Sequence, residues 1–216
     1  MANHSSAIDY FNENAQKLSA EYNAVDRAQV HSDLLQFLPS KKLHMLDIGA
    51  GSGADANMFA AMGHEVVAVE PAQTLRDLAN KTFQNKNIKW CADDLPALTS
   101  VKTAKEKFDV IYSVGTIQYL DEAERTAALK TMVSLLKDDG LIEVQYPTPP
   151  SREHQFRVGL DEVKNFVAAF NKKAKDGRQL QIVRENIKAI SGRKARDGTD
   201  LYFNTTIIKS VKTPHA

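Results

Sequence analysis

A glycine-rich turn at residues 46–53 constrains the fold more than any other feature of the sequence. It reads LDIGAGSG and places glycines at positions 49, 51 and 53. A short apolar run, 43–48, precedes the turn, and a helical pattern, 54–62, follows it. Glycine permits a positive φ and lets a ligand approach the backbone, while the start of a helix presents unpaired N–H groups. The turn therefore indicates a nucleoside-binding strand–turn–helix unit, although similar turns also serve only to connect elements.

The second apolar run, EVVAVE at 65–70, ends in Glu70, about twenty residues after the turn. At this place in a βαβ unit, a carboxylate can accept hydrogen bonds from both ribose hydroxyls of an adenosine. A solvated charge at the end of a strand is the alternative. The turn and the acid occur together in the right frame, which favours nucleoside binding.

Strand and helix patterns alternate along most of the remaining chain. Further strands are expected at 88–91, 108–113 and 141–146, and helices at 74–85, 121–136 and 160–175. Thr74 is the expected N-cap of its helix, and Asp139-Gly140 the stop of the helix at 121–136. Two longer runs, 180–190 and 201–211, have no helix between them and predict an antiparallel hairpin. These patterns predict an α/β fold with a mostly parallel sheet.

The chain is expected to be one domain, residues 1–216, in three parts. A helical cap covers 1–40, a cofactor-binding core 41–150, and a C-terminal helix with an edge hairpin 151–216. Net charge is +1, which argues against a broad nucleic-acid or membrane footprint, and the single cysteine, Cys91, excludes an intrachain disulfide. The N-terminal residues lack a signal-peptide pattern and no apolar run approaches membrane-spanning length, so a cytoplasmic location is expected.

A nicotinamide dinucleotide is a second candidate ligand. Gly49, Gly51 and Ala54 satisfy the G-x-G-x-x-G/A pattern of NAD-binding turns. Asp47, directly before the turn, suits a cationic ligand better than a pyrophosphate. The third glycine, the helical lead-in and the lack of a separate substrate domain also argue against an oxidoreductase.

An ordered series of motifs resembles the class I S-adenosylmethionine-dependent methyltransferases. LDIGAGSG and EVVAVEP are similar to the family's first two motifs, and ADDLPAL, FDVIYSVGTIQYL and LLKDDGLIEVQYP follow in the family's order. The resemblance covers residues 7–146 and, more faintly, the final hairpin. It implies a Rossmann-like, doubly wound, seven-stranded sheet with a reversed last strand and an N-terminal helical lead-in. It also implies S-adenosylmethionine as cofactor and methyl transfer to an oxygen or nitrogen nucleophile, here of a small molecule.

Site residues follow from the same resemblance, position by position. The glycine turn would surround the methionine and ribose parts, Glu70 would hold the ribose, Pro71 and Ala72 would pack beside the adenine, and an acid at 93–94, with Asp93 favoured, would meet its amino group. The residues expected to bind the cofactor are Asp47, Gly49, Ala50, Gly51, Gly53, Glu70, Pro71, Ala72, Asp93, Asp94 and Ser113.

Substrate contacts are expected at the ends of the fourth and fifth strands and in the lead-in. The candidates are Tyr10, Tyr22, Tyr119, Tyr146 and Arg152, with Thr116 and Gln118 beside them. His154 is the candidate general base, since an ordinary histidine pKa of about 6.5 suits the role. Core packing explains the lead-in tyrosines equally well, and solvation explains His154. The six histidines are scattered, and no metal site is expected.

Other functions stay open at this point. A nucleic-acid methyltransferase would resemble its relatives in an N/D-P-P-Y/F motif after the fourth strand, where this chain has Ser113-Val114-Gly115-Thr116. Arg193, Lys194 and Arg196 form a small basic patch that a solvated hairpin tip also explains. A protein methyltransferase and a non-catalytic S-adenosylmethionine-binding protein remain as alternatives. The sequence gives no oligomeric state.

Overall fold

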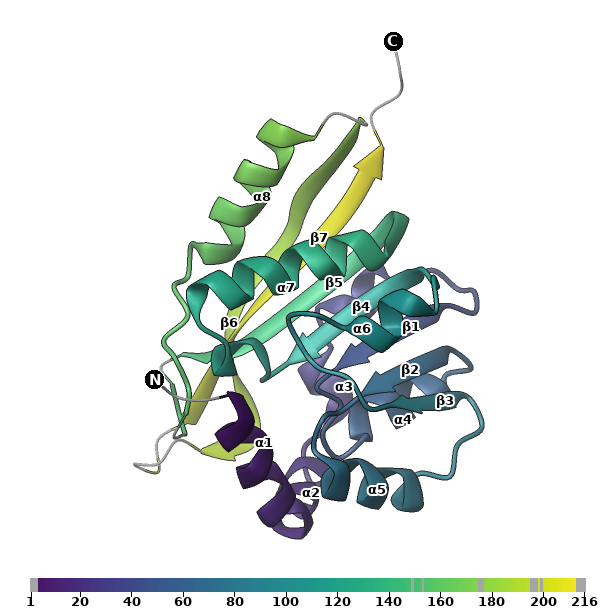
Figure 1. Cartoon of the computed structure of the whole chain (residues 1–216), viewed down its shortest axis with the longest axis vertical. Coiled ribbons are helices and arrows are strands. Elements are labelled where there is room, and N and C mark those ends of the chain that lie inside the picture. The colour runs from purple at the N-terminus through teal and green to yellow at the C-terminus, as the bar shows by residue number, and fades with distance from the viewer. Residues whose placement is uncertain are drawn as a thin grey trace.

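Seven strands form one mixed sheet in the order β3-β2-β1-β4-β5-β7-β6 (Figure 1). The computed structural model describes residues 4–148, 150–152, 154–174, 177–194, 198 and 200–212. The strands are β1 His44–Ile48, β2 Glu65–Val69, β3 Ile88–Cys91, β4 Phe108–Val114, β5 Leu136–Thr148, β6 Arg178–Lys194 and β7 Asp200–Lys212. β1 to β5 pair in parallel, whereas β7 runs antiparallel to both β5 and β6. The predicted Rossmann-like fold with its C-terminal hairpin is confirmed.

Helices cover both faces of the sheet. They are α1 His4–Glu13, α2 Ala15–Asn23, α3 Arg27–Val30, α4 Ala54–Ala61, α5 Gln73–Thr82, α6 Thr99–Thr103, α7 Glu122–Leu135 and α8 Glu162–Lys173, with 3-10 turns η1 Leu34–Phe37 and η2 Ile117–Tyr119. In Figure 1, α6 and α7 lie on the near face, α3 and α4 lie behind the sheet, and α1, α2 and α5 lie together at its lower end. None of the described helices is long and apolar enough to cross a membrane.

Successive side chains of a buried strand point to opposite faces of the sheet, so the hydrophobic core is divided between the two faces. Leu46 packs in one cluster with residues of α6, α7 and α8, whereas its neighbour Met45 packs in the other with residues of α4. β1 lies between β2 and β4, so the connections after β1 and β4 leave toward opposite faces. A crevice opens at the carboxyl ends of the strands at such a switch point, and ligands bind there.

The helical lead-in is broken into short pieces that fold over this end of the sheet. Asp26 begins α3 by accepting hydrogen bonds from the backbone of Ala28 and Gln29 at 2.9 and 3.3 Å. The predicted N-cap role of Thr74 is wrong, because α5 already begins at Gln73. The Thr74 amide instead donates to Asn12 Oδ1 of α1 at 2.8 Å. A side chain of the lead-in thus satisfies the start of α5.

The prediction that Asp139-Gly140 ends the helix at 121–136 is also wrong. α7 ends at Leu135, and β5 begins at once with Leu136, which pairs with Phe108. Asp139, at φ +61°, and Gly140 lie where the register between β4 and β5 shifts, so they form an irregularity within the strand. Pro149, Arg196 and the side chains of Arg193 and Lys194 lie outside the described residues.

Candidate functional site

A cavity of about 1070 Å³, including open solvent at its mouth, lies at the carboxyl ends of β1, β2 and β4. Its floor is the glycine turn after β1 and the end of β2. Side chains of α1 and the segment after β5 close it from the other side. The lining residues are Ala7, Ile8, Phe11, Tyr22, Arg27, Ile48, Gly49, Ala50, Gly51, Ser52, Asp55, Val69, Glu70, Pro71, Leu75, Asp93, Asp94, Leu95, Val114, Gly115, Thr116, Gln118, Tyr119, Leu120, Pro147, Ser151, Arg152, Gln155 and Phe203.

The glycine turn is bound to the end of β2 through its backbone. The amides of Gly49 and Ala50 both donate to the Val69 carbonyl at 2.9 Å. Gly49 has φ +74°, and a Cβ there would lie 2.8 Å from Thr116 Cγ2. Gly51, at φ +55°, would bring a Cβ to 3.6 Å from the Tyr22 ring. The turn therefore requires glycine for its backbone conformation and, at Gly49, for space.

Glu70 is a buried carboxylate in the wall of this cavity. Its side chain accepts hydrogen bonds from the Gly51 amide at 2.8 Å and from the Ala72 amide at 2.9 Å. Burial raises the pKa of Glu70 to about 6, and the two backbone amides limit the rise. Each carboxylate oxygen has a second lone pair, so the group can still accept hydrogen bonds from a ligand.

The structure brings seven of the eleven expected cofactor residues to the cavity. Gly49, Ala50, Gly51, Glu70, Pro71, Asp93 and Asp94 line it, whereas Asp47, Gly53, Ala72 and Ser113 do not. Gly53 is needed for packing, because a Cβ there would lie 2.8 Å from the Trp90 ring. Ala72 is fully buried and contributes its amide to Glu70, and Ser113 is fully buried in β4. These residues support the wall from behind.

Asp93 and Asp94 are the two acids expected near the adenine. The Asp93 carboxylate accepts three backbone hydrogen bonds, from Asp94 at 3.0 Å and from Thr99 and Val101 at 3.1 Å. Thr99 and Val101 belong to the first turn of α6, so Asp93 caps a helix that the sequence patterns missed. Both Asp93 and Asp94 line the cavity, and the Asp93 carboxylate also holds the start of α6.

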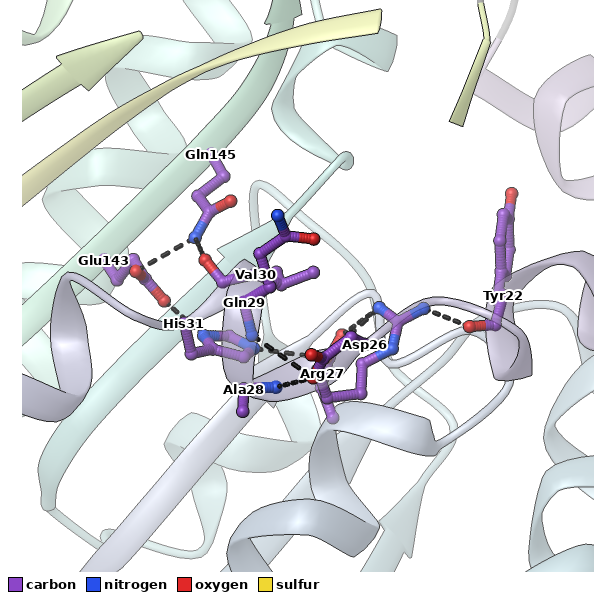
Figure 2. A network of polar contacts seen from close by, with 10 residues as sticks. Tyr22, Asp26, Arg27, Ala28, Gln29, Val30, His31, Glu143 and Gln145 are labelled. Atoms are coloured by element: carbon purple, nitrogen blue, oxygen red, sulfur yellow. Dashed lines mark hydrogen bonds and ion pairs between the residues drawn. The ribbon is translucent and has the colours of Figure 1, made fainter. Parts of the chain in front are cut away.

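A network of buried charged side chains links the residues around α3 to β5 (Figure 2). His31 is fully buried, with Nδ1 2.5 Å from Glu143 Oε2 and Nε2 3.1 Å from Asp55 Oδ1. Burial alone would lower the His31 pKa, but the two carboxylates raise it to about 10. The imidazolium therefore joins α4 to β5 from its place after α3. Gln145 also belongs to this network, because it donates to Glu143 Oε1 at 3.0 Å.

Arg27 extends the network to the cavity. The Arg27 guanidinium lies 3.3 Å from Asp55. It also donates to the Tyr22 carbonyl, as Figure 2 shows. Burial would raise the Asp55 pKa, but Arg27 and His31 lower it to about 2. Asp47 faces the same network: burial first, and then the Asp55 charge, raises its pKa well above the usual range. Asp55 thus carries the negative charge at this wall, which the sequence assigns to Asp47.

Of the five expected substrate residues, three line the cavity and two do not. Tyr22, Tyr119 and Arg152 line the cavity. The Arg152 guanidinium lies 5.9 Å from the centre of the Tyr22 ring and donates to Tyr10 Oη at 3.2 Å and to Glu21 at 3.1 Å. It therefore fastens the segment after β5 to α1 and α2. Burial raises the pKa of Tyr119 to about 12, so its hydroxyl stays protonated.

Tyr10, Tyr146 and His154 lie outside the cavity lining. Tyr146 is fully buried, and its hydroxyl accepts from Asn204 at 2.6 Å. His154 Nδ1 lies 3.4 Å from Ser6 Oγ. Tyr10 supports Arg152, as described above. Within the described residues, no group of three histidine, cysteine or acidic side chains could hold a metal ion.

Comparison with known proteins agrees with this geometry. Residues 45–140, which span β1 to the irregularity in β5, match the family model described as a methyltransferase domain. This match, over somewhat less than half of the chain, agrees with the resemblance to class I S-adenosylmethionine-dependent methyltransferases that the sequence motifs indicate. The matched stretch contains the glycine turn, Glu70, Asp94 and the end of β4. It therefore holds most of the floor of the cavity.

Curated relatives are similar to about half of this chain. An uncharacterized methyltransferase of Staphylococcus carnosus (strain TM300) is 31% identical over 112 residues, 51% of this chain and 50% of the relative. The ubiquinone biosynthesis O-methyltransferase of Bartonella tribocorum (strain CIP 105476 / IBS 506) is 29% identical over 118 residues, 54% of this chain and 46% of the relative. The chain spans about half the length of these relatives.

Solved structures share the fold of this chain over nearly its whole length. Phosphoethanolamine N-methyltransferase 1 of Haemonchus contortus superposes with a TM-score of 0.70 at 17% identity, covering 99% of this chain and 49% of the other. Magnesium protoporphyrin IX methyltransferase of Synechocystis PCC 6803 gives a TM-score of 0.70 at 12% identity, covering 97% and 99%. At such identities the likeness shows the fold.

Sequence patterns missed several residues of the cavity. Arg27, Asp55, Phe11, Gln155 and Phe203 line it although none was expected there. Asp55 follows Gly53 by two residues. An acidic residue in the first turn of the helix after the glycine turn was a sequence signal for a cavity residue. Arg27 and Gln155 stand in no recognisable motif. They reach the cavity only because separate segments of the chain fold together.

Proposed function

We propose that this chain transfers a methyl group from S-adenosylmethionine to a nitrogen or oxygen of a small molecule. The observation that carries the proposal is the buried Glu70 carboxylate, held against the glycine turn at the base of a cavity. Relatives and structural neighbours named as acting in ubiquinone biosynthesis or on phosphoethanolamine support a small-molecule substrate. The whole of residues 1–216 would act as one methyltransferase domain, with the predicted cap, core and C-terminal parts.

The residues present fit the cofactor part by part. Glu70 would accept hydrogen bonds from the ribose hydroxyls, and Asp93 or Asp94 would accept one from the adenine amino group beside Pro71. Gly49 and Gly51 line the cavity with a backbone of positive φ, and this backbone would face the methionine part. Arg27 and Asp55 present one charge of each sign at the wall, which suits the zwitterionic end of an amino acid.

Positioning is the main task of this chain in the reaction. S-adenosylmethionine supplies a methyl group that is already electrophilic. The protein must hold the nucleophile in line with that methyl group and exclude water, and such orientation lowers barriers by about 7–11 kcal/mol in well-aligned cases. Arg152, Tyr22 and Tyr119 would form the substrate side of the cavity. His154 stays a candidate base only if the segment after β5 turns it inward.

Ligand-dependent thermal unfolding tests the proposal. S-adenosylmethionine and S-adenosylhomocysteine should each raise the Tm, because a ligand at a hundred times its Kd stabilises the folded state by about 2.7 kcal/mol. NAD and NADP should leave the Tm unchanged. A shift with NAD alone would favour the oxidoreductase alternative. A shift with S-adenosylhomocysteine but no methyl transfer to any metabolite, protein or nucleic-acid extract would favour a non-catalytic binding protein.

The cellular setting stays a prediction. The near-zero net charge supports a small-molecule substrate over nucleic acid, and a cytoplasmic location is the expectation from the sequence. Fractionation of cells with an antibody against the chain checks the location. Labelled methyl transfer to total nucleic acid checks the substrate class.

A further inference from the structure

Arg152 carries the charge on the substrate side of the cavity. Five other charged side chains belong to the described lining, and all of them lie on the cofactor side: Arg27, Asp55, Glu70, Asp93 and Asp94. The first two pair with each other, and the other three follow β2 and β3. Arg152 instead lies in the segment after β5, which closes the cavity from the opposite side. This side therefore presents a positive charge to a ligand.

The hydrogen-bonding capacity of the Arg152 guanidinium is only partly used. Of its five N–H donors, one donates to Tyr10 Oη at 3.2 Å and one to Glu21 Oε2 at 3.1 Å. The Glu21 side chain is 43% exposed and lies outside the cavity lining, so water screens this ion pair. The Arg152 side chain keeps 26% of its surface exposed. Its charge and its remaining N–H groups are therefore available to a ligand.

Aromatic side chains make the surroundings of this cation less polar than water. The guanidinium lies 5.9 Å from the centre of the Tyr22 ring, and Phe11 meets Tyr119 edge to face with ring centres 5.3 Å apart. These three aromatic residues also line the cavity. A charge attracts an opposite charge more strongly in such surroundings than in water. The wall therefore suits a ligand with an apolar body and one anionic group.

Gln155 connects Arg152 to a second hydrogen-bond donor. Its Oε1 atom accepts from the amides of Ser151 and Arg152 at 2.8 and 3.1 Å, and its Nε2 donates to Tyr119 Oη at 3.0 Å. Because the Tyr119 oxygen accepts this bond, its own hydrogen can be donated to a ligand. Burial raises the pKa of Tyr119 to about 12, so the hydroxyl keeps that hydrogen at neutral pH. One side chain thus holds a cation and a hydroxyl donor in a fixed relation.

We propose that Arg152 and Tyr119 bind an acidic group, a carboxylate or a phosphate, of the molecule that receives the methyl group. This inference rests on the proposed function and narrows its substrate to small organic acids. Guanidinium N–H groups match the spacing of two oxygens of such an anion. The accepting nitrogen or oxygen lies on another part of the same molecule, and the bound acid orients it toward the methyl group. Phe11 and Tyr22 would pack against the carbon skeleton.

Methyl transfer to matched pairs of small molecules tests the proposal. Labelled S-adenosylmethionine is supplied with hydroxy- and amino-substituted carboxylates and phosphate monoesters. Each acid is paired with an uncharged partner, the carboxamide in place of the carboxylate or the methyl ether in place of the phosphate. The wild type should label acids with a kcat/KM at least tenfold above that of their partners. The preferred series tells whether the bound group is a carboxylate or a phosphate.

Substitutions of the two donors should lower this selectivity, the ratio of kcat/KM between an acid and its uncharged partner. Arg152→Gln should lower it about ten- to a hundredfold, as expected for the loss of a hydrogen bond to a charged group. Arg152→Lys, which keeps the charge, should recover part of the loss, and Tyr119→Phe should lower the ratio by a smaller factor. Arg157→Gln is the matched control. Arg157 lies exposed in the same segment and outside the cavity lining, so the ratio should not change.

Glu21→Gln separates anion binding from the fastening of the segment after β5. This substitution breaks the ion pair with α2 but leaves the Arg152 cation in place. If Arg152 only fastens the segment, Glu21→Gln and Arg152→Gln should impair acids and uncharged partners alike and leave their ratio unchanged. If Arg152 binds the substrate, Glu21→Gln should keep the ratio or increase it, because a competing carboxylate is removed.

Each other outcome contradicts a definite statement. Preferred labelling of the uncharged partners, or an unchanged ratio in Arg152→Gln, overturns the role of Arg152 and leaves the methyltransferase function intact. An unchanged ratio in Tyr119→Phe removes Tyr119 from the anion site. A loss of S-adenosylhomocysteine affinity in Arg152→Gln, measured by titration calorimetry, would assign the guanidinium to the cofactor and overturn the proposal. Labelling of neither series overturns the proposed transfer to small molecules, and the inference falls with it.

Discussion

The Gly51 amide donates to Glu70 Oε2 at 2.8 Å and thereby joins the turn after β1 to the end of β2. The other oxygen of Glu70 accepts from the Ala72 amide at 2.9 Å. The carboxylate that we propose for the ribose therefore also holds the two backbone segments around it. Its removal would disturb the shape of the site together with its chemistry, so its variants need a control that reports on the ribose contact alone.

Glu70→Ala should weaken cofactor binding at least tenfold, because hydrogen bonds to charged groups contribute about 1.5–3 kcal/mol each. Glu70→Gln should lose less, since one acceptor oxygen remains. Titration calorimetry with S-adenosylhomocysteine measures both. The control is the 2′-deoxy form of the cofactor. The wild type should bind this form more weakly than the normal cofactor, and the difference in affinity should be smaller in Glu70→Ala. A wild type that binds both ligands equally would remove Glu70 from the ribose contact.

Replacement of Gly49 should cost more stability than backbone strain alone explains. Gly63 has φ +95° and open space at the Cβ position, whereas Gly49 would also collide with Thr116. Gly63→Ala should therefore lower the free energy of unfolding by about 1–2 kcal/mol through strain, and Gly49→Ala by clearly more. Urea unfolding measures the difference. In a Thr116→Gly background the two alanine substitutions should cost nearly the same, and a persistent gap would contradict the steric explanation.

Removal of the His31 imidazolium should destabilise the fold strongly. His31→Leu leaves the carboxylates of Glu143 and Asp55 buried without their shared cation, and breaking a buried ion pair costs about 3–5 kcal/mol. Guanidinium unfolding measures the loss. A double-mutant cycle with Glu143→Gln should show a smaller cost for His31→Leu when Glu143 no longer carries charge. Additive effects would mean that the two groups are not coupled.

The same histidine predicts a pH dependence of stability. The pKa of His31 in the folded chain is raised from 6.5 to about 10, so the folded state holds the proton more tightly than the unfolded state. Its contribution is fully present below pH 6.5 and is lost as pH rises through 10. The free energy of unfolding of the wild type should therefore fall across this window. His31→Gln should show a flatter profile, and an equal slope in both proteins would contradict the raised pKa.

Local patterns in the sequence were sufficient for the fold and for the floor of the site. The apolar strands, the glycine turn and Glu70 lie within one βαβ unit, where strand, turn and helix follow one another directly. Their geometry depends on short-range backbone conformation and on the pairing of β1 with β2, so residue order nearly determines it. The final hairpin was likewise predictable, because two adjacent long strands without a helix between them pair antiparallel.

Side-chain roles that depend on distant segments were decided by the tertiary structure alone. Sequence patterns could not show that Asp93 is committed to the start of α6, or that Tyr146 is bonded to Asn204 away from the cavity. His31 and Glu143 stand 112 positions apart and meet only because the end of α3 lies beside β5, where the Val30 carbonyl also accepts from Gln145. Whether a polar group is satisfied, shared or left for a ligand depends on every segment that folds around it, and a one-dimensional pattern does not contain those contacts.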